Sequence, residues 1–71
     1  MLVVTLEGRD GDPVFIDNWN AGPLPLQSEV IGGLHDVRIE GEAGTVRLDQ
    51  FLVEFDDSGR SVLDVGALTQ Q

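Results

Sequence analysis

The residues of this sequence that could do chemistry are carboxylates, one histidine and a few hydroxyls, and their spacing fits no catalytic or metal-binding motif. His35 is the only histidine, and no motif sets a serine beside it as a nucleophile. Asp10-Gly11-Asp12 and Asp56-Asp57-Ser58-Gly59 are rich in acids, but neither has the spacing of a calcium loop. We therefore expect these acids to form turns and His35 to lie at the surface. We expect a protein that is not an enzyme, with no catalytic residue, metal or cofactor.

The sequence also lacks the marks of a phosphate site, a disulfide framework or a targeting signal. Gly32-Gly33 has neither the further glycines nor the lysine of a phosphate loop. There is no cysteine, so neither a disulfide nor a thiolate metal site can form. Residues 1–7 lack the basic start of a signal peptide, and no stretch approaches the roughly 20 apolar residues of a membrane span. We expect a soluble, cytoplasmic protein.

Charge is the most informative property of the chain. Thirteen Asp and Glu residues face four Arg, which gives a formal net charge of -9 on 71 residues. This sign disfavours direct binding to nucleic acid or to an anionic membrane, because contact with phosphates needs a basic surface. Two interpretations remain: the acids adapt the surface to salt, or they present carboxylates to a basic partner protein. Arg38 and Arg47 interrupt the acids, and cross-strand pairing with Glu40 or Asp49 would weaken their field.

The elements that must position these residues are short strands, because apolar side chains alternate with a period of two. Residues 2–6 and 13–16 predict a first hairpin around the turn residues 8–12. Residues 36–40 and 45–49 predict a second hairpin around a turn that contains two glycines. The apolar side chains of this second hairpin are expected to face inward: Val37, Ile39, Val46 and Leu48.

The alternation changes its parity after Asp49. Phe51, Val53 and Phe55 occupy odd positions, whereas the inward side chains of the preceding strand occupy even ones. A bulge or corner at Gln50 would explain the switch. Residues 57–59 then have the composition of a turn that sends the chain back.

The end of the sequence allows two interpretations. Residues 61–65 alternate as a strand would, but Ser61 and Asp64 have the spacing of a helix-capping box, so residues 62–69 could instead form a short helix. With six or seven short strands, the chain predicts an all-β fold, either a small barrel or a two-sheet sandwich of antiparallel strands. A chain of this length is expected to form a single domain over residues 1–71.

The segment between the two predicted hairpins, residues 17–27, breaks the alternating pattern. Pro23 and Pro25 remove backbone donors, which predicts an ordered loop or an edge rather than a central strand. Trp19, the only tryptophan, lies in this segment with Leu24. A large amphipathic side chain of this kind either anchors a partner or covers the end of the core.

Three classes of function remain. The first is a non-enzymatic module that binds a basic partner protein through carboxylates, with an inhibitor that imitates nucleic-acid charge as one form. The second is a structural subunit of a homo-oligomer or a larger, for example viral, assembly, which the apolar residues 62–68 favour. The third is a small enzyme or ligand binder, which needs a pocket of about 300 Å³ in a core with little room for one. The candidate partner-binding residues are Trp19, Leu24, Glu40, Glu42, Asp49, Glu54, Asp56 and Asp57.

Overall fold

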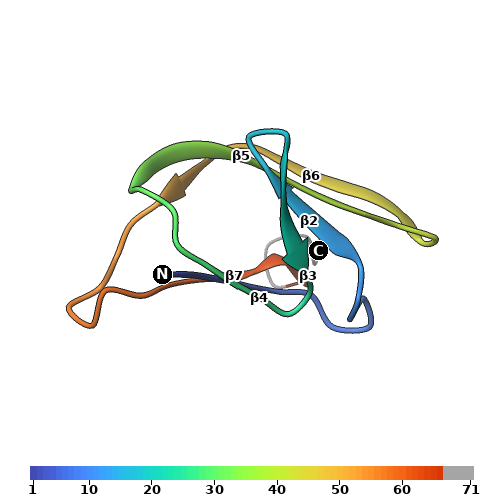
Figure 1. The fold of residues 1–71 in the computed structure, drawn as a ribbon, viewed down its shortest axis with the longest axis horizontal. Coiled ribbons are helices and arrows are strands. Elements are labelled where there is room, and N and C mark those ends of the chain that lie inside the picture. Colours follow the sequence, from blue (N-terminus) through green and yellow to red (C-terminus); the bar gives the residue numbers. More distant parts are fainter. Residues whose placement is uncertain (67–71) are drawn as a thin grey trace.

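Seven strands make up nearly all of the regular structure in a computed structural model that describes residues 1–66. Figure 1 shows the long strands β5 and β6 arching over a second layer that contains β1, β4 and β7. The strands follow in the order β1 (Leu2–Thr5), β2 (Pro13–Ile16), β3 (Trp19–Pro23), β4 (Leu26–Ser28), β5 (Gly33–Gly41), β6 (Gly44–Val53) and β7 (Ser61–Asp64).

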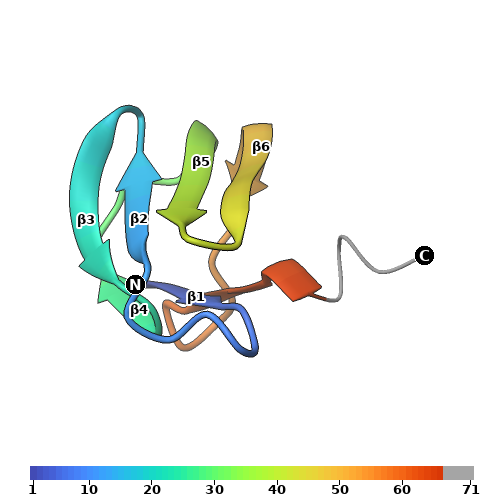
Figure 2. The ribbon, with the colours of Figure 1, turned by 90° about the vertical axis from the view of Figure 1, so that its right-hand side faces the viewer.

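The strands form two sheets, which confirms the predicted small all-β, two-sheet fold. One sheet has three strands in the order β4-β1-β7, and the other has four in the order β3-β2-β5-β6. Figure 2 shows the four strands of the larger sheet side by side, above β1 and β4. The pairs among these seven strands are antiparallel, as predicted, except for β1 with β7. These two strands run parallel, so the expectation of antiparallel strands alone is wrong here. The first and last strands of the described chain are therefore neighbours in one sheet.

The core lies between the two sheets and is built from the alternating apolar residues of both. Leu2 and Val4 of β1 are fully buried, and Leu63 of β7 lies beside them. Val37 and Ile39 of β5 face them from the larger sheet and are equally well buried. Burial of apolar surface is the main stabilising term in a domain of this size, and none of the described buried residues is polar or charged.

The predicted first hairpin is wrong, because β1 and β2 belong to different sheets. The connection between them is fixed instead to a later part of the chain. The N–H of Gly11 donates to the carbonyl of Leu24 at 2.9 Å, and the N–H of Leu24 donates to the carbonyl of Asp12 at 2.9 Å. These bonds hold the connection in place where the chain crosses from one sheet to the other.

The predicted second hairpin is confirmed as β5 and β6, which pair from Gly41 with Gly44 to Gly33 with Val53. The predicted bulge is confirmed as well. His35 lies opposite Phe51 and Val37 opposite Leu48, so β6 carries one extra residue at this point. Gln50 within the bulge has a φ of 55°, in the left-handed region. The extra residue restores Phe51 and Val53 to the inward face.

Residues 17–27 include two strands that lie at sheet edges, as predicted. Asp17 and Asn18 have φ values of 53° and 67° and form a two-residue turn that joins β2 to β3. Positive φ at both positions is the mark of the type I′ hairpin turn, which Asp and Asn tolerate. Strand β3 is the edge of the larger sheet, and β4 is the edge of the smaller one.

The last described part of the chain forms a strand rather than a helix from Ser61 to Asp64. It is tied to the N-terminus: the N–H of Ser61 donates to the carbonyl of Met1 at 2.9 Å, and the Met1 ammonium donates to the carbonyl of Gly59 at 2.6 Å. Helical geometry begins only at Val65 and Gly66. The remainder of the alternative helix, residues 67–69, lies outside the described residues.

Candidate functional site

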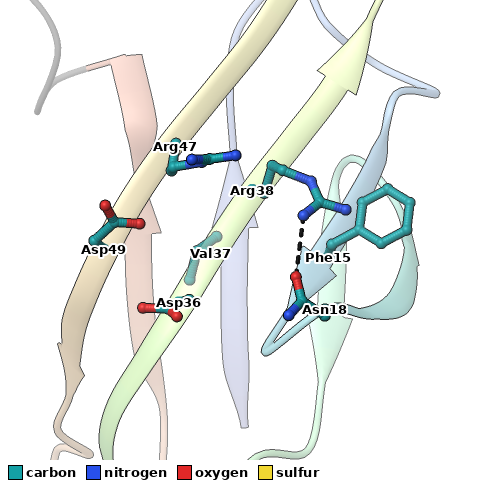
Figure 3. Close-up of a pocket in the computed structure, with 7 residues that line it drawn as sticks. All are labelled: Phe15, Asn18, Asp36, Val37, Arg38, Arg47 and Asp49. Atoms are coloured by element: carbon teal, nitrogen blue, oxygen red, sulfur yellow. Dashed lines mark hydrogen bonds between the residues drawn. The ribbon is translucent and has the colours of Figure 1, made fainter.

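A shallow pocket of about 190 Å³ lies on the outer face of the larger sheet. Figure 3 shows its side chains, which come from β5, β6, β2 and the turn after β2. Charged side chains dominate it, and two of the four arginines of the chain are among them. The lining residues are Phe15, Asn18, Asp36, Val37, Arg38, Arg47 and Asp49.

Arg38 is held firmly on one side of this pocket. Its guanidinium lies 4.5 Å from the centre of the Phe15 ring, and its Nη1 donates to Oδ1 of Asn18 at 3.1 Å (Figure 3). Its Nε lies 2.5 Å from Oε2 of Glu40 in an ion pair. The stacked ring, the amide and the carboxylate fix the orientation of a long side chain that would otherwise lose rotamer entropy on binding.

Arg47 lies directly opposite Arg38 in the β5–β6 ladder. Like charges that face each other across two strands repel. Among residues 1–66, the Arg47 side chain makes no hydrogen bond or ion pair, and neither does Asp49 two residues further along β6. Internal pairing therefore weakens the acidic field at Glu40, but through Arg38 of the same strand and not across strands as predicted, and it does not occur at Asp49.

A chain of hydrogen bonds connects this face to the end of the β2–β3 hairpin. Oδ1 of Asp36 accepts the N–H of Gln50 at 3.0 Å, and the N–H of Asp36 donates to Oδ1 of Asp17 at 3.0 Å. Nδ1 of His35 lies 2.6 Å from Oδ2 of Asp17, and its Nε2 lies 2.8 Å from the carbonyl oxygen of Ile31. Both partners of the imidazole are acceptors, so the cationic form of His35 satisfies both.

These contacts shift two pKa values in opposite directions. The Asp17 carboxylate first, and then the Ile31 carbonyl, raise the pKa of His35. The backbone N–H of Asp36 first, and then His35, lower the pKa of Asp17. The His35 side chain is 10% exposed, so this histidine is less accessible than expected, although its partner Asp17 lies in an exposed turn. His35 faces inward on β5 because it shares parity with Val37, and its ring nitrogens are occupied rather than free for proton transfer.

The structure separates the candidate partner-binding residues rather than bringing them together. Trp19 is 64% exposed on the edge strand β3, and Leu24 is 3% exposed within the core. The Leu24 side chain is therefore not part of the outer surface, because both backbone bonds of Leu24 draw this residue onto the β1–β2 connection. Glu40 and Asp49 lie on β5 and β6, with Glu40 already paired to Arg38.

The remaining candidates follow the chain around β6. Glu42 is exposed in the β5–β6 turn, and Glu54 and Asp57 are exposed in the segment that leaves β6. Figure 1 shows this turn and the loop before β7 at opposite ends of the longest axis, which measures 35 Å. These carboxylates therefore lie at the two ends of the molecule rather than in one cluster.

Asp56 is a turn former, as the acid-rich spacing predicted. Its Oδ1 accepts the Ser58 hydroxyl at 2.6 Å, the Ser58 N–H at 3.0 Å and the Arg60 N–H at 3.0 Å. The Ser58 hydroxyl first, and then the Arg60 N–H, lower the pKa of Asp56. Because three donors bind one of its oxygens, this carboxylate stabilises the turn.

Seven of the thirteen acids have no such hydrogen bond or ion pair within residues 1–66. Among residues 1–66 these carboxylates are exposed and make no hydrogen bond or ion pair. By contrast, Arg9 is bound to Asp12 and to the carbonyl of Gly44, and Arg38 to Glu40. The surface charge is thus left largely uncompensated. The seven residues are Glu7, Asp10, Glu29, Glu42, Asp49, Glu54 and Asp57.

Sequence reasoning missed two pairings on the outer face of the larger sheet. Arg38 opposite Arg47 could have been found by counting outward from the β5–β6 turn. Leu34 lies opposite Leu52, and both side chains are about half exposed or more. This second pair depends on the bulge, because the extra residue of β6 changes which side chains of β5 it faces.

The fold and the surface together define a small, acidic, two-sheet β domain with a mixed-charge outer face. No three His, Asp or Glu side chains of residues 1–66 come together as metal ligands. Within the same residues, no helix has the length and hydropathy needed to cross a membrane. No protein-family model, curated protein or solved structure matches the chain.

Proposed function

We propose that this protein is a non-enzymatic binding module that engages the basic surface of a partner protein through its exposed carboxylates. The observation that carries the proposal is the set of seven acids that have no internal partner, set against a net charge of -9. A field of one sign accelerates the encounter with a partner of the opposite sign and selects against acidic competitors. An acidic surface of this kind suits a basic protein rather than a nucleic acid.

The carboxylates that flank β6, Glu42 before it and Glu54 and Asp57 after it, are the part of the surface assigned to this function. Among residues 1–66 these three are exposed and unpaired, and they lie outside the strand itself, so their replacement leaves the ladder intact. They lie at the two ends of the molecule, which suits a long basic face or groove on the partner. A nucleic-acid-binding groove is one such face, and an inhibitor that fills it is the narrower form of the proposal.

The experiment compares two variants that each remove three negative charges. E42Q/E54Q/D57N removes the acids that flank β6, and E7Q/D10N/E29Q removes three other exposed acids. Immobilised wild-type protein is expected to capture a basic protein from cell lysate at low salt, and E7Q/D10N/E29Q to retain that capture. Capture should be lost from E42Q/E54Q/D57N. The proposal is contradicted if no basic protein is captured or if both variants behave alike.

A structural subunit of a homo-oligomer or larger assembly is the second candidate, and exposed apolar side chains favour it. Leu34 and Leu52 face each other and are 60% and 49% exposed, and Ile31 and Phe55 are also exposed. Apolar side chains gathered at an exposed position mark surfaces that another molecule covers. L34S/L52S should then reduce the solution mass measured by light scattering. An unchanged mass would exclude this pair from any assembly.

A further inference from the structure

Strand β6 is an open edge of the larger sheet. It is ten residues long, and among residues 1–66 only β5 pairs with it. Figure 2 shows it at the end of the row β3, β2, β5, β6. At its start, Arg9 Nη2 donates to the carbonyl of Gly44 at 2.7 Å, and at its far end the bulge bends the strand at Gln50. Residues 45–49 between these points present one edge of unpaired backbone groups.

Open edges are usually protected by charged side chains that oppose pairing with another chain. On β6 the two charges, Arg47 and Asp49, have opposite signs. They are two residues apart, so they point to the same outer face about 7 Å from each other. Among residues 1–66, neither makes an ion pair or a side-chain hydrogen bond. An edge with this arrangement is complementary to a second copy of itself.

We propose that two copies of this protein pair through β6, antiparallel, about a two-fold axis at Leu48. In this register Arg47 lies beside Asp49 of the partner subunit, and Asp49 lies beside Arg47 of the partner subunit. Side chains directly opposite across antiparallel strands share a face and approach to about 5 Å, close enough for an ion pair. The interface is isologous, and the two four-stranded sheets become one continuous sheet.

The same register accounts for two further features of the strand. Arg47 faces Arg38 across the β5–β6 ladder, and a carboxylate from the partner subunit offsets this repulsion. On the inner face, Val46 and Leu48 pack against the core but remain only partly buried. Pairing about Leu48 brings the Leu48 side chains of the two copies together and covers them further. The bulge at Gln50 limits the length of the new ladder.

Salt separates this pairing from capture of a basic partner. Two copies that each carry a charge of -9 repel each other at long range, and salt screens this repulsion within a Debye length of about 10 Å at 0.1 M. The ion pairs at close contact are screened less. Self-association should therefore hold or strengthen as salt increases, whereas binding to a basic protein weakens. Failure of self-association through β6 would therefore leave the proposed binding to a basic partner intact, and failure of that binding would leave self-association intact.

Reciprocal charge variants test the register. R47D places two acids on the edge, and D49R places two bases on it. Each variant alone should therefore self-associate at least about tenfold more weakly than wild type. Mixing the two variants should restore association as a heterodimer, and R47D/D49R should restore the homodimer. R60D and E29R make the same charge changes outside β6 and should behave as wild type.

Analytical ultracentrifugation across protein concentration and salt gives the readout, with circular dichroism to verify that each variant is folded. Amide hydrogen exchange provides a second measurement on the unmodified protein. Exchange at residues 45–49 should slow as protein concentration rises, without any change at the amides of β4, another edge strand. A wild type that is monomeric throughout, or a mixture of R47D and D49R that does not associate, would overturn the proposal.

Discussion

The carboxylate of Asp36 accepts the backbone N–H of Gln50 at 3.0 Å, across the point where β6 carries one residue more than β5. The bond occupies a donor that the bulge removes from the regular ladder. It joins the bulge to Asp17 and His35 through the N–H of Asp36, so a single polar chain runs from the β2–β3 turn to β6.

The backbone of Gln50 predicts a stabilising substitution. Its φ of 55° places an L-residue in the left-handed region, which costs about 1–2 kcal/mol relative to a right-handed conformation. Gln50→Gly removes this strain, but glycine loses more conformational entropy than glutamine on folding. We therefore expect the free energy of unfolding to rise by about 0.5 kcal/mol. Urea denaturation measures the change. Gln27→Gly in β4 has no positive φ to relieve and should be destabilising; equal effects of the two would contradict the assigned backbone.

The His35–Asp17 pair predicts a pH-dependent contribution to stability. The pKa of His35 is raised in the folded state, so its contribution is complete below the ordinary histidine pKa of about 6.5 and is lost as pH rises through the folded value. The pKa of Asp17 is lowered, so its contribution is present above about 3.9 and is lost as pH falls through the folded value. The pair is therefore strongest between about pH 4 and 6.5.

His35→Gln checks this directly. The variant should melt at a lower temperature than wild type near pH 5, and the difference should shrink as pH rises through the folded pKa of His35, where the wild-type imidazole loses its proton. The bond from the N–H of Asp36 to Asp17 persists in both, so the loss is partial. A difference in melting temperature that is constant with pH would show that the charge of His35 contributes nothing.

Substitution by alanine should change the free energy of unfolding very differently at two neighbouring residues of β7. Leu63 is 1% exposed and Val62 is 61% exposed, because adjacent residues of a strand point to opposite faces. Leu63→Ala should lower the free energy of unfolding by about 2–4 kcal/mol, which is much of the stability of so small a domain. Val62→Ala should change it by less than about 0.5 kcal/mol. Similar losses for both would contradict a strand at this position.

Local alternation was sufficient to predict β5, β6 and the bulge, because the parity change from Leu48 to Phe51 is written in the sequence itself. The position of β1 was not predictable in this way. It depends on bonds between the Gly11–Asp12 turn and Leu24, more than ten residues further on, and on parallel pairing with β7. Turn composition at residues 8–12 indicated a reversal of the chain but not the sheet that the chain enters next.

The candidate surface was predictable residue by residue but not as an arrangement. Exposure of Glu42, Asp49 and Glu54 follows from outward parity and turn positions. Burial of Leu24 does not, since the spacing of the flanking prolines gives no direction for its side chain. Cross-strand pairing was expected for Arg38, but its ion pair with Glu40 runs along β5, where the two residues share parity. The position of Arg47 opposite Arg38 required the register of both strands.

The central claim is that unpaired carboxylates bind a basic partner protein, and the salt dependence of that affinity tests it most directly. Titration calorimetry with the captured partner should show at least about tenfold weaker binding in about 500 mM salt than in about 50 mM salt. The E42Q/E54Q/D57N variant should bind more weakly at low salt and depend less on salt, while E7Q/D10N/E29Q stays near wild type. Equal affinity of the wild type at both salt concentrations would contradict the account.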